Sequence, residues 1–141
     1  LKIFDEMTDN ISLSIVGKKE KDYLNNDKVS FVGHEYETSK LIKIYDDHNI
    51  FILPSFTEAH PKVLDESLAR GRPVIIFEEI KHVIQNKEGI FVSKRNAKSL
   101  SETIHFIMKN YLNIQEKMTN NNKLPTKEEF ILQMSNILSS N

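Results

Sequence analysis

The sequence has no cysteine and only four glycines, and each shortage excludes a class of site. Without cysteine there is no disulfide framework, no thiolate metal site and no cysteine nucleophile. The glycines are scattered, at Gly17, Gly33, Gly71 and Gly89. A glycine loop that binds phosphate needs two or three of them within about six residues, so neither a GxGxxG loop nor a P-loop can form. A nucleotide would have to be held by other means.

An excess of charge of one sign and long apolar runs are also lacking. Nineteen basic residues against twenty acidic ones leave a formal net charge of -1, whereas a nucleic-acid binder needs a basic excess. We therefore expect no nucleic-acid partner. No apolar run approaches the roughly 20 residues of a membrane-spanning helix. With 141 residues, of which 39% are hydrophobic and 28% charged, the chain has the length and composition of one globular domain.

Short apolar runs alternate with helical patterns along the chain. Nearly unbroken apolar runs of this length are typical of strands that are buried on both faces of a parallel sheet. Such runs predict strands over residues 11–16, 29–32, 50–53, 73–77 and 89–92. Strands that alternate with helices predict an α/β fold, a Rossmann-like open parallel sheet flanked by helices, in a single domain over residues 1–141.

The helices between the strands are marked by their spacing and their end residues. Helical periodicity predicts helices over residues 39–46 and 61–70. Asn96 can cap another helix, and Thr126 with Glu129 forms a capping box that opens the last one. The asparagine-rich stretch 119–123 is expected to be a loop between the C-terminal helices.

One segment, PSFTEAHPKVLDESLARGRPV at residues 54–74, carries the functional signal. After the strand that ends at Pro54, a loop carries Glu58, and the helix that begins near Pro61 carries Glu66. In open α/β sheets ligands bind at the carboxyl ends of strands, and unpaired amides at helix N-termini attract anions. Carboxylates accept hydrogen bonds from hydroxyls. Two of them, eight positions apart, could hold the two polyhydroxyl rings that flank the diphosphate of a sugar nucleotide.

This segment resembles the Glu-x7-Glu signature of retaining glycosyltransferases of the GT-B fold, in the family called group 1 or GT4. The likeness extends to LSIVG at 13–17, VSFVG at 29–33 and NKEGIFV at 86–92. The resemblance implies a donor-binding domain from the C-terminal half of such an enzyme, which moves a sugar from a nucleotide-sugar donor, with UDP expected, to a glycan or lipid-linked acceptor. The first strand of that domain, its cationic loop and the acceptor domain have no counterpart here. We therefore expect the chain to be a fragment that is inactive alone.

The resemblance implies a role for individual residues. Glu58 would contact hydroxyls of the transferred sugar and is the predicted catalytic residue, whereas Glu66 would hold the ribose. Gly33 and His34 would contact the base, largely through the backbone. The segment between the two glutamates would meet the sugar and the diphosphate, and its predicted donor-binding residues are Ala59, His60, Pro61, Lys62, Val63 and Leu64.

Each of these assignments has a simpler alternative. Glu66 can be a solvated carboxylate on a helix surface, Glu58 can cap the helix that follows it, and His60 can be a capping or packing residue. For the chain as a whole, the alternative is a non-catalytic nucleotide- or protein-binding Rossmann-like module.

No metal or cofactor is expected, because the sequence has no Asp-x-Asp triplet of the kind that metal-dependent glycosyltransferases use. The resemblance implies a bacterial, cytoplasmic enzyme of cell-surface polysaccharide synthesis. It also allows a peripheral position of the parent protein at the inner membrane, through the part that is missing here.

Overall fold

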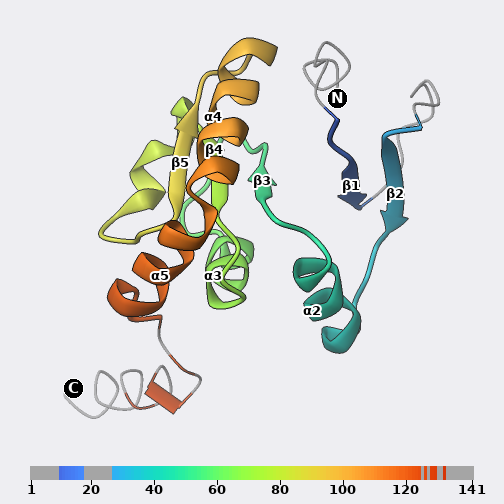
Figure 1. The fold of residues 1–141 in the computed structure, drawn as a ribbon. Coiled ribbons are helices and arrows are strands. Elements are labelled where there is room, and N and C mark those ends of the chain that lie inside the picture. The colour runs from blue at the N-terminus through green and yellow to red at the C-terminus, as the bar shows by residue number, and fades with distance from the viewer. Residues whose placement is uncertain (1–9, 18–26, 125, 127, 130–131, 133–141) are drawn as a thin grey trace.

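The computed structural model describes residues 10–17, 27–124, 126, 128–129 and 132 of the chain. Its strands are β1 (Leu13–Val16), β2 (Val29–Gly33), β3 (Phe51–Leu53), β4 (Val74–Phe77) and β5 (Ile90–Ser93) (Figure 1). Its helices are α2 (Thr38–Asp46), α3 (Lys62–Ala69), α4 (Ala97–Lys109) and α5 (Tyr111–Asn121), with a 3-10 segment, η1 (Glu78–Ile84), after β4. Within the described ranges, no helix is both long and apolar enough to cross a membrane.

All strand pairs are parallel, which confirms the predicted α/β fold with parallel strands flanked by helices. The hydrogen bonds divide the strands into two sets, β1-β2 and β3-β4-β5, and β1 and β2 lie together apart from β3 (Figure 1). A doubly wound sheet has the strand order 3-2-1-4-5-6. In that order, β1 and β2 match the strands numbered 2 and 3, and β3, β4 and β5 match the strands numbered 4, 5 and 6. Among the described residues, no strand pairing joins β1 to β3.

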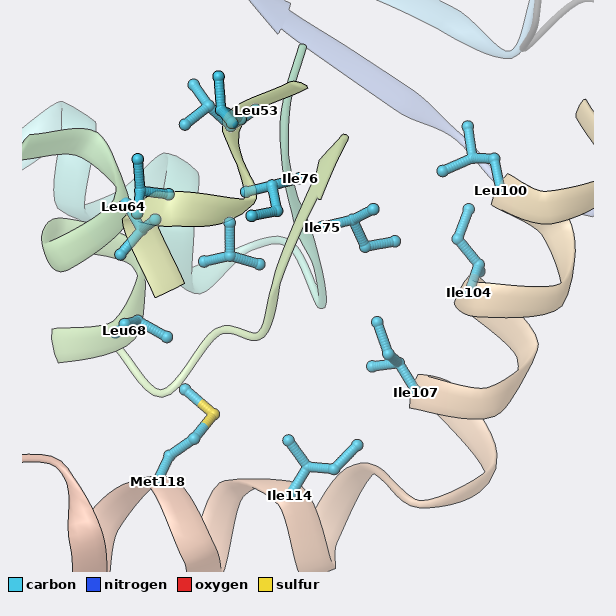
Figure 2. Close-up of a cluster of buried hydrophobic side chains, with 13 residues drawn as sticks. Leu53, Leu64, Leu68, Ile75, Ile76, Leu100, Ile104, Ile107, Ile114 and Met118 are labelled. Atoms are coloured by element: carbon cyan, nitrogen blue, oxygen red, sulfur yellow. The ribbon is translucent and has the colours of Figure 1, made fainter. Parts of the chain in front are cut away.

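The core forms around β4, whose four side chains are at most 3% exposed. Neighbouring side chains of a strand point to opposite faces. Ile76 accordingly points toward α3 and Ile75 toward α4 (Figure 2). The helices contribute a common set of buried apolar side chains, namely Leu64, Leu68, Leu100, Ile104, Ile107, Ile114 and Met118. Burial on both faces explains why the strand reads as an unbroken apolar run.

The ends of the helices agree with the predicted signals to within one or two residues. Pro61 is the N-cap of α3 rather than a helical residue, because its ψ of 110° is extended. Gly71 follows the end of that helix with a φ of 65°. The side chain of Asn96 caps α4 by accepting a 2.9 Å hydrogen bond from the amide of Ser99.

The predicted capping box near the C-terminus is also confirmed. The amide of Thr126 donates to the Glu129 carboxylate at 2.8 Å, and the amide of Glu129 donates to the Thr126 hydroxyl at 3.1 Å. Most of the helix that this box was predicted to open lies outside the described residues.

The prediction of a loop over residues 119–123 is wrong for its first half, because α5 continues to Asn121. Asparagine has a low helix propensity, but packing of an apolar face provides most of the stability of helices in proteins. Ile114 and Met118 of α5 are 8% and 3% exposed, against the core. The helix then ends at Asn122, whose side chain bonds the amide and the carbonyl of Glu88 at 2.8 and 2.9 Å.

The contact between Gly89 and α5 gives a stability prediction. Gly89 has a φ of +87°, and a Cβ there would lie 2.4 Å from Sδ and 2.6 Å from Cγ of Met118. We expect Gly89→Ala to lower the free energy of unfolding by about 1–3 kcal/mol more than Gly71→Ala does, because only the first overpacks the core. Gly71 is the matched control, since its φ is +65° and its nearest neighbour, Gln115, is 3.6 Å away. Urea unfolding measures both, and equal losses would contradict the predicted crowding.

Candidate functional site

The carboxyl ends of β3, β4 and β5 lie at one edge of their sheet because the three strands are parallel. The loop of residues 54–61 follows β3 there and leads into α3, while η1 follows β4 (Figure 1). Arg95, just after β5, reaches the same loop and donates to the carbonyls of Pro54 and Ser55, both at 3.1 Å. The predicted functional segment therefore lies at the edge where α/β proteins bind ligands.

Glu58 is half-buried in this loop and is held at two points. The hydroxyl of Ser55 donates to Oε1 of Glu58 at 2.6 Å, and the backbone carbonyl of Glu58 accepts from Nε2 of His82 at 2.7 Å. Within the described part of the chain its side chain makes no hydrogen bond to an amide of α3, so the structure does not support the capping alternative.

Glu66 lies on the exposed side of α3 and is bonded by a residue of α2. The hydroxyl of Tyr45 donates to Oε2 of Glu66 at 3.2 Å and also lies 3.5 Å from the carbonyl of Val63. Burial, followed by the charge and the hydrogen bond of Glu66, raises the pKa of the Tyr45 phenol. The phenol therefore remains a hydrogen-bond donor, and one side-chain oxygen of Glu66 is already oriented.

The residues between the two glutamates differ in exposure. Pro61 and Leu64 are buried, and the amide of Leu64 donates to the carbonyl of Pro61 at 3.0 Å. Amides at the first positions of a helix have no intrahelical acceptor. Those amides belong here to Lys62 and Val63, which are both exposed.

The ring of His60 takes part in a small cluster of polar side chains beside the start of α3. Its Nε2 lies 3.0 Å from Oδ2 of Asp65, whose other oxygen accepts from Nζ of Lys87 at 2.7 Å. The ring of His60 remains largely exposed, whereas Lys87 and Asp65 are 16% and 22% exposed. This pairing gives the side chain of His60 a partner on α3.

Gly33 and His34 lie at the carboxyl end of β2, in the other strand set. Gly33 has a φ of +81° at a bulge of β2, and its carbonyl accepts from the amide of Gly17 at 2.8 Å. His34 stacks on Tyr36 with ring centroids 6.2 Å apart. No contact between described residues joins Gly33 or His34 to the two glutamates.

Sequence reasoning missed the side chains that hold the predicted residues in place. Tyr45 and Arg95 act on positions 21 and 40 residues away in the chain, so only the folded chain brings them to the site. His82 was missed for the same reason. Ser55 could have been found, since it stands three residues before Glu58 in a turn. Across the described residues, no three His, Cys, Asp or Glu side chains come together as a potential metal site.

Comparisons with known proteins identify the family of the chain. Residues 1–124 match the family described as glycosyl transferases group 1, and the chain belongs to that family. A Haemophilus influenzae protein described as an uncharacterized glycosyltransferase is 29% identical over 136 residues, which are 88% of this chain and 33% of the relative. A Campylobacter jejuni N,N'-diacetylbacillosaminyl-diphospho-undecaprenol alpha-1,3-N-acetylgalactosaminyltransferase is 29% identical over 90 residues, which are 62% of this chain and 23% of the relative.

A solved structure has the same fold. Sucrose-phosphate synthase from Thermosynechococcus elongatus superposes with a TM-score of 0.69 at 21% identity, over 92% of this chain and 38% of that one. This likeness supports a GT-B type of fold. The chain spans a third or less of the length of the two curated relatives.

The ion pair that fixes α2, and with it Tyr45, against the end of α3 gives a prediction about pH. Arg70 donates to both oxygens of Asp46, at 2.9 and 2.5 Å, and this hydrogen bonding lowers the pKa of the Asp46 carboxyl from 3.8. A carboxyl whose pKa is lowered by folding stabilises the folded protein at pH values above its pKa in the unfolded chain. This stabilisation is lost as the pH falls through its pKa in the folded protein. We therefore expect Asp46→Asn to lower Tm at pH 6, and the difference from wild type to close as the pH falls below 3.8.

The neighbouring residue provides the control. Asp47, which follows the end of α2, pairs with the exposed Lys43 of that helix at 3.0 Å, and exposed ion pairs contribute little to stability. Asp47→Asn should change Tm much less than Asp46→Asn at pH 6. A Tm difference for Asp46→Asn that persists unchanged at low pH would show that its charge is not the cause.

Proposed function

We propose that this chain is most of the donor-binding domain of a retaining glycosyltransferase of the GT4 type. The full-length parent would transfer a sugar from a nucleotide-sugar, with UDP as the nucleotide, to a glycan or lipid-linked acceptor. The observation that carries the proposal is the loop-to-helix segment at the carboxyl end of β3. It places one fixed carboxylate, Glu58, before the start of α3 and a second, Glu66, within the helix.

The two glutamates would bind different parts of the donor. Glu66 is the fifth residue of α3, and helical side chains lean toward the N-terminus of their helix. With Oε2 bonded by Tyr45, its second oxygen can accept from a ribose hydroxyl. Glu58 would face hydroxyls of the sugar, with its carboxylate oriented by Ser55.

The start of α3 suits the diphosphate between them. The amides of Lys62 and Val63 have no intrahelical acceptor, and the helix dipole favours an anion there. Lys62 itself carries a positive charge in the first turn, where the dipole disfavours cations, and it forms no ion pair with another described residue. A bound diphosphate would satisfy both the amides and this charge.

The chemistry would follow from this arrangement. As the bond between sugar and diphosphate breaks with retention, positive charge grows on the anomeric carbon and negative charge on the departing phosphate. The carboxylate of Glu58 would stabilise the first charge and orient the sugar, and the start of α3 would stabilise the second. The departing phosphate is then placed to accept the proton of the acceptor hydroxyl.

A lipid-linked acceptor agrees with the name of the Campylobacter jejuni relative, which describes a diphospho-undecaprenol substrate for that protein. For the parent of this chain we propose a bacterial, cytoplasmic enzyme of cell-surface polysaccharide synthesis that can lie against the inner membrane. The acceptor would bind to parts of the parent outside these 141 residues. Sugar transfer by the chain alone is therefore not expected.

The two glutamates can be separated by kinetics of the full-length parent. Ribose does not change during the reaction, so Glu66→Ala should raise the donor KM and weaken UDP binding by about 1.5–3 kcal/mol, the contribution of a charged hydrogen bond. Glu58→Gln keeps size and removes charge, so it should lower kcat and leave UDP affinity nearly unchanged. Calorimetric titration with UDP and donor kinetics measure the two effects.

Glu116, an exposed glutamate of α5, is the matched control. Glu116→Ala should change neither quantity. If Glu58→Gln weakens UDP as much as Glu66→Ala does, the division of roles is wrong. If the parent binds no nucleotide-sugar and transfers no sugar, the alternative of a non-catalytic module is favoured instead.

A further inference from the structure

Arg95 contacts several groups at the carboxyl edge of the sheet at the same time. Its guanidinium donates to the carbonyls of Pro54 and Ser55, both at 3.1 Å. It also donates to both carboxylate oxygens of Glu79, at 3.1 and 3.4 Å. The side chain is 23% exposed.

The guanidinium also lies over two aromatic rings. Its Cζ is 3.9 Å from the ring centroid of Phe56 and 4.1 Å from that of Phe77. Phe77 is buried at the end of β4, but Phe56 is 69% exposed in the loop that carries Glu58. Such a contact attracts a cation to the face of a ring. Arg95 therefore links an exposed aromatic ring of the loop to the buried end of the sheet.

These contacts cross the sheet. Arg95 follows β5, whereas Pro54 and Ser55 follow β3, and β4 lies between the two strands. Neighbouring strands are about 4.8 Å apart, so Arg95 and its hydrogen bonds together bridge roughly 10 Å across the end of β4. It fixes the first three residues of the loop relative to all three strands.

The same contacts lead to the carboxylate of Glu58. Ser55, whose carbonyl is bound by Arg95, donates its hydroxyl to Glu58 at 2.6 Å. At the far side of the loop, His82 binds the carbonyl of Glu58 at 2.7 Å. We propose that Arg95 is a positioning residue for Glu58, acting through Ser55, and that it sets the rate of sugar transfer without touching the donor. This inference rests on the role proposed above for Glu58.

Only a guanidinium can make this set of contacts at once. Its planar fork presents five donors and stacks on aromatic rings, whereas a lysine ammonium is a compact charge with three donors. Arg95→Lys therefore keeps the charge opposite Glu79 and removes the simultaneous hold on Pro54, Ser55 and Phe56. This conservative change is the informative variant.

The test uses the full-length parent and measures both structure and rate. In Arg95→Lys, amides of residues 54–60 should exchange with solvent about fivefold faster or more, since a loop that loses its contacts opens more often. The kcat should fall about tenfold or more, because small displacements of a catalytic group are costly, while the Kd of UDP stays within about twofold, since Glu66 and α3 are untouched.

Two further variants separate positioning from a general loss of structure. If Arg95 acts through Glu58, adding Arg95→Lys to Glu58→Gln should lower kcat no further, because coupled residues are non-additive. Glu116→Ala is the control, since Glu116 is an exposed residue of α5. It should leave kcat and the exchange of residues 54–60 unchanged.

Each result decides the proposal. Unchanged exchange of residues 54–60 in Arg95→Lys overturns it whether or not the parent transfers sugar. A full, additive loss of kcat in the double variant, or a parallel loss of UDP affinity, overturns the route through Glu58. Faster exchange in a parent that transfers no sugar would instead leave the contact of Arg95 with the loop standing and overturn the proposed function.

Discussion

The burial of β4 on both faces is the constraint on which the other parts of the structure depend. Its side chains pack between α3 on one face and α4 on the other, and they are almost completely removed from water (Figure 2). Burial of this kind is the dominant favourable term in folding. Because β3 and β5 pair with β4 as parallel strands, the segments that follow the three strands lie at one edge of the sheet. The candidate site is built from those segments.

The side chains at that edge hold one another in place, which agrees with a site that is organised before a ligand arrives. Tyr45 orients Glu66, Ser55 orients Glu58, and Arg95 fixes the loop to which Ser55 belongs. Preorganised groups lose less conformational freedom on binding and stabilise charge at little further cost. Gly33 ends β2 and His34 follows it, so their distance from this edge depends on how the two strand sets are joined.

The sequence predicts the order of helices and strands well, because the residues that begin or end these elements act on their near neighbours in the chain. Gly71 follows the end of α3 and Asn96 caps the start of α4, and both contact residues only a few positions away in the chain. The location of the glutamate segment follows from the same local signals. By contrast, α5 was not predicted, since its asparagines read as a loop and only packing of Met118 on the core favours the helix. Tyr45, which bonds Glu66, and Arg95, which bonds the loop that carries Glu58, were missed because they reach these positions from distant parts of the chain.

The donor-binding role of this edge is best tested by a crystal structure of the full-length parent with UDP bound, because it locates the nucleotide relative to α3. We predict a ribose hydroxyl about 2.5–3.0 Å from the carboxylate of Glu66. We also predict the diphosphate within hydrogen-bond distance of the amides of Lys62 and Val63, and the base beside Gly33. UDP bound at the amino ends of the strands, or a Glu66 carboxylate that contacts only Tyr45 while UDP lies elsewhere, would contradict this role.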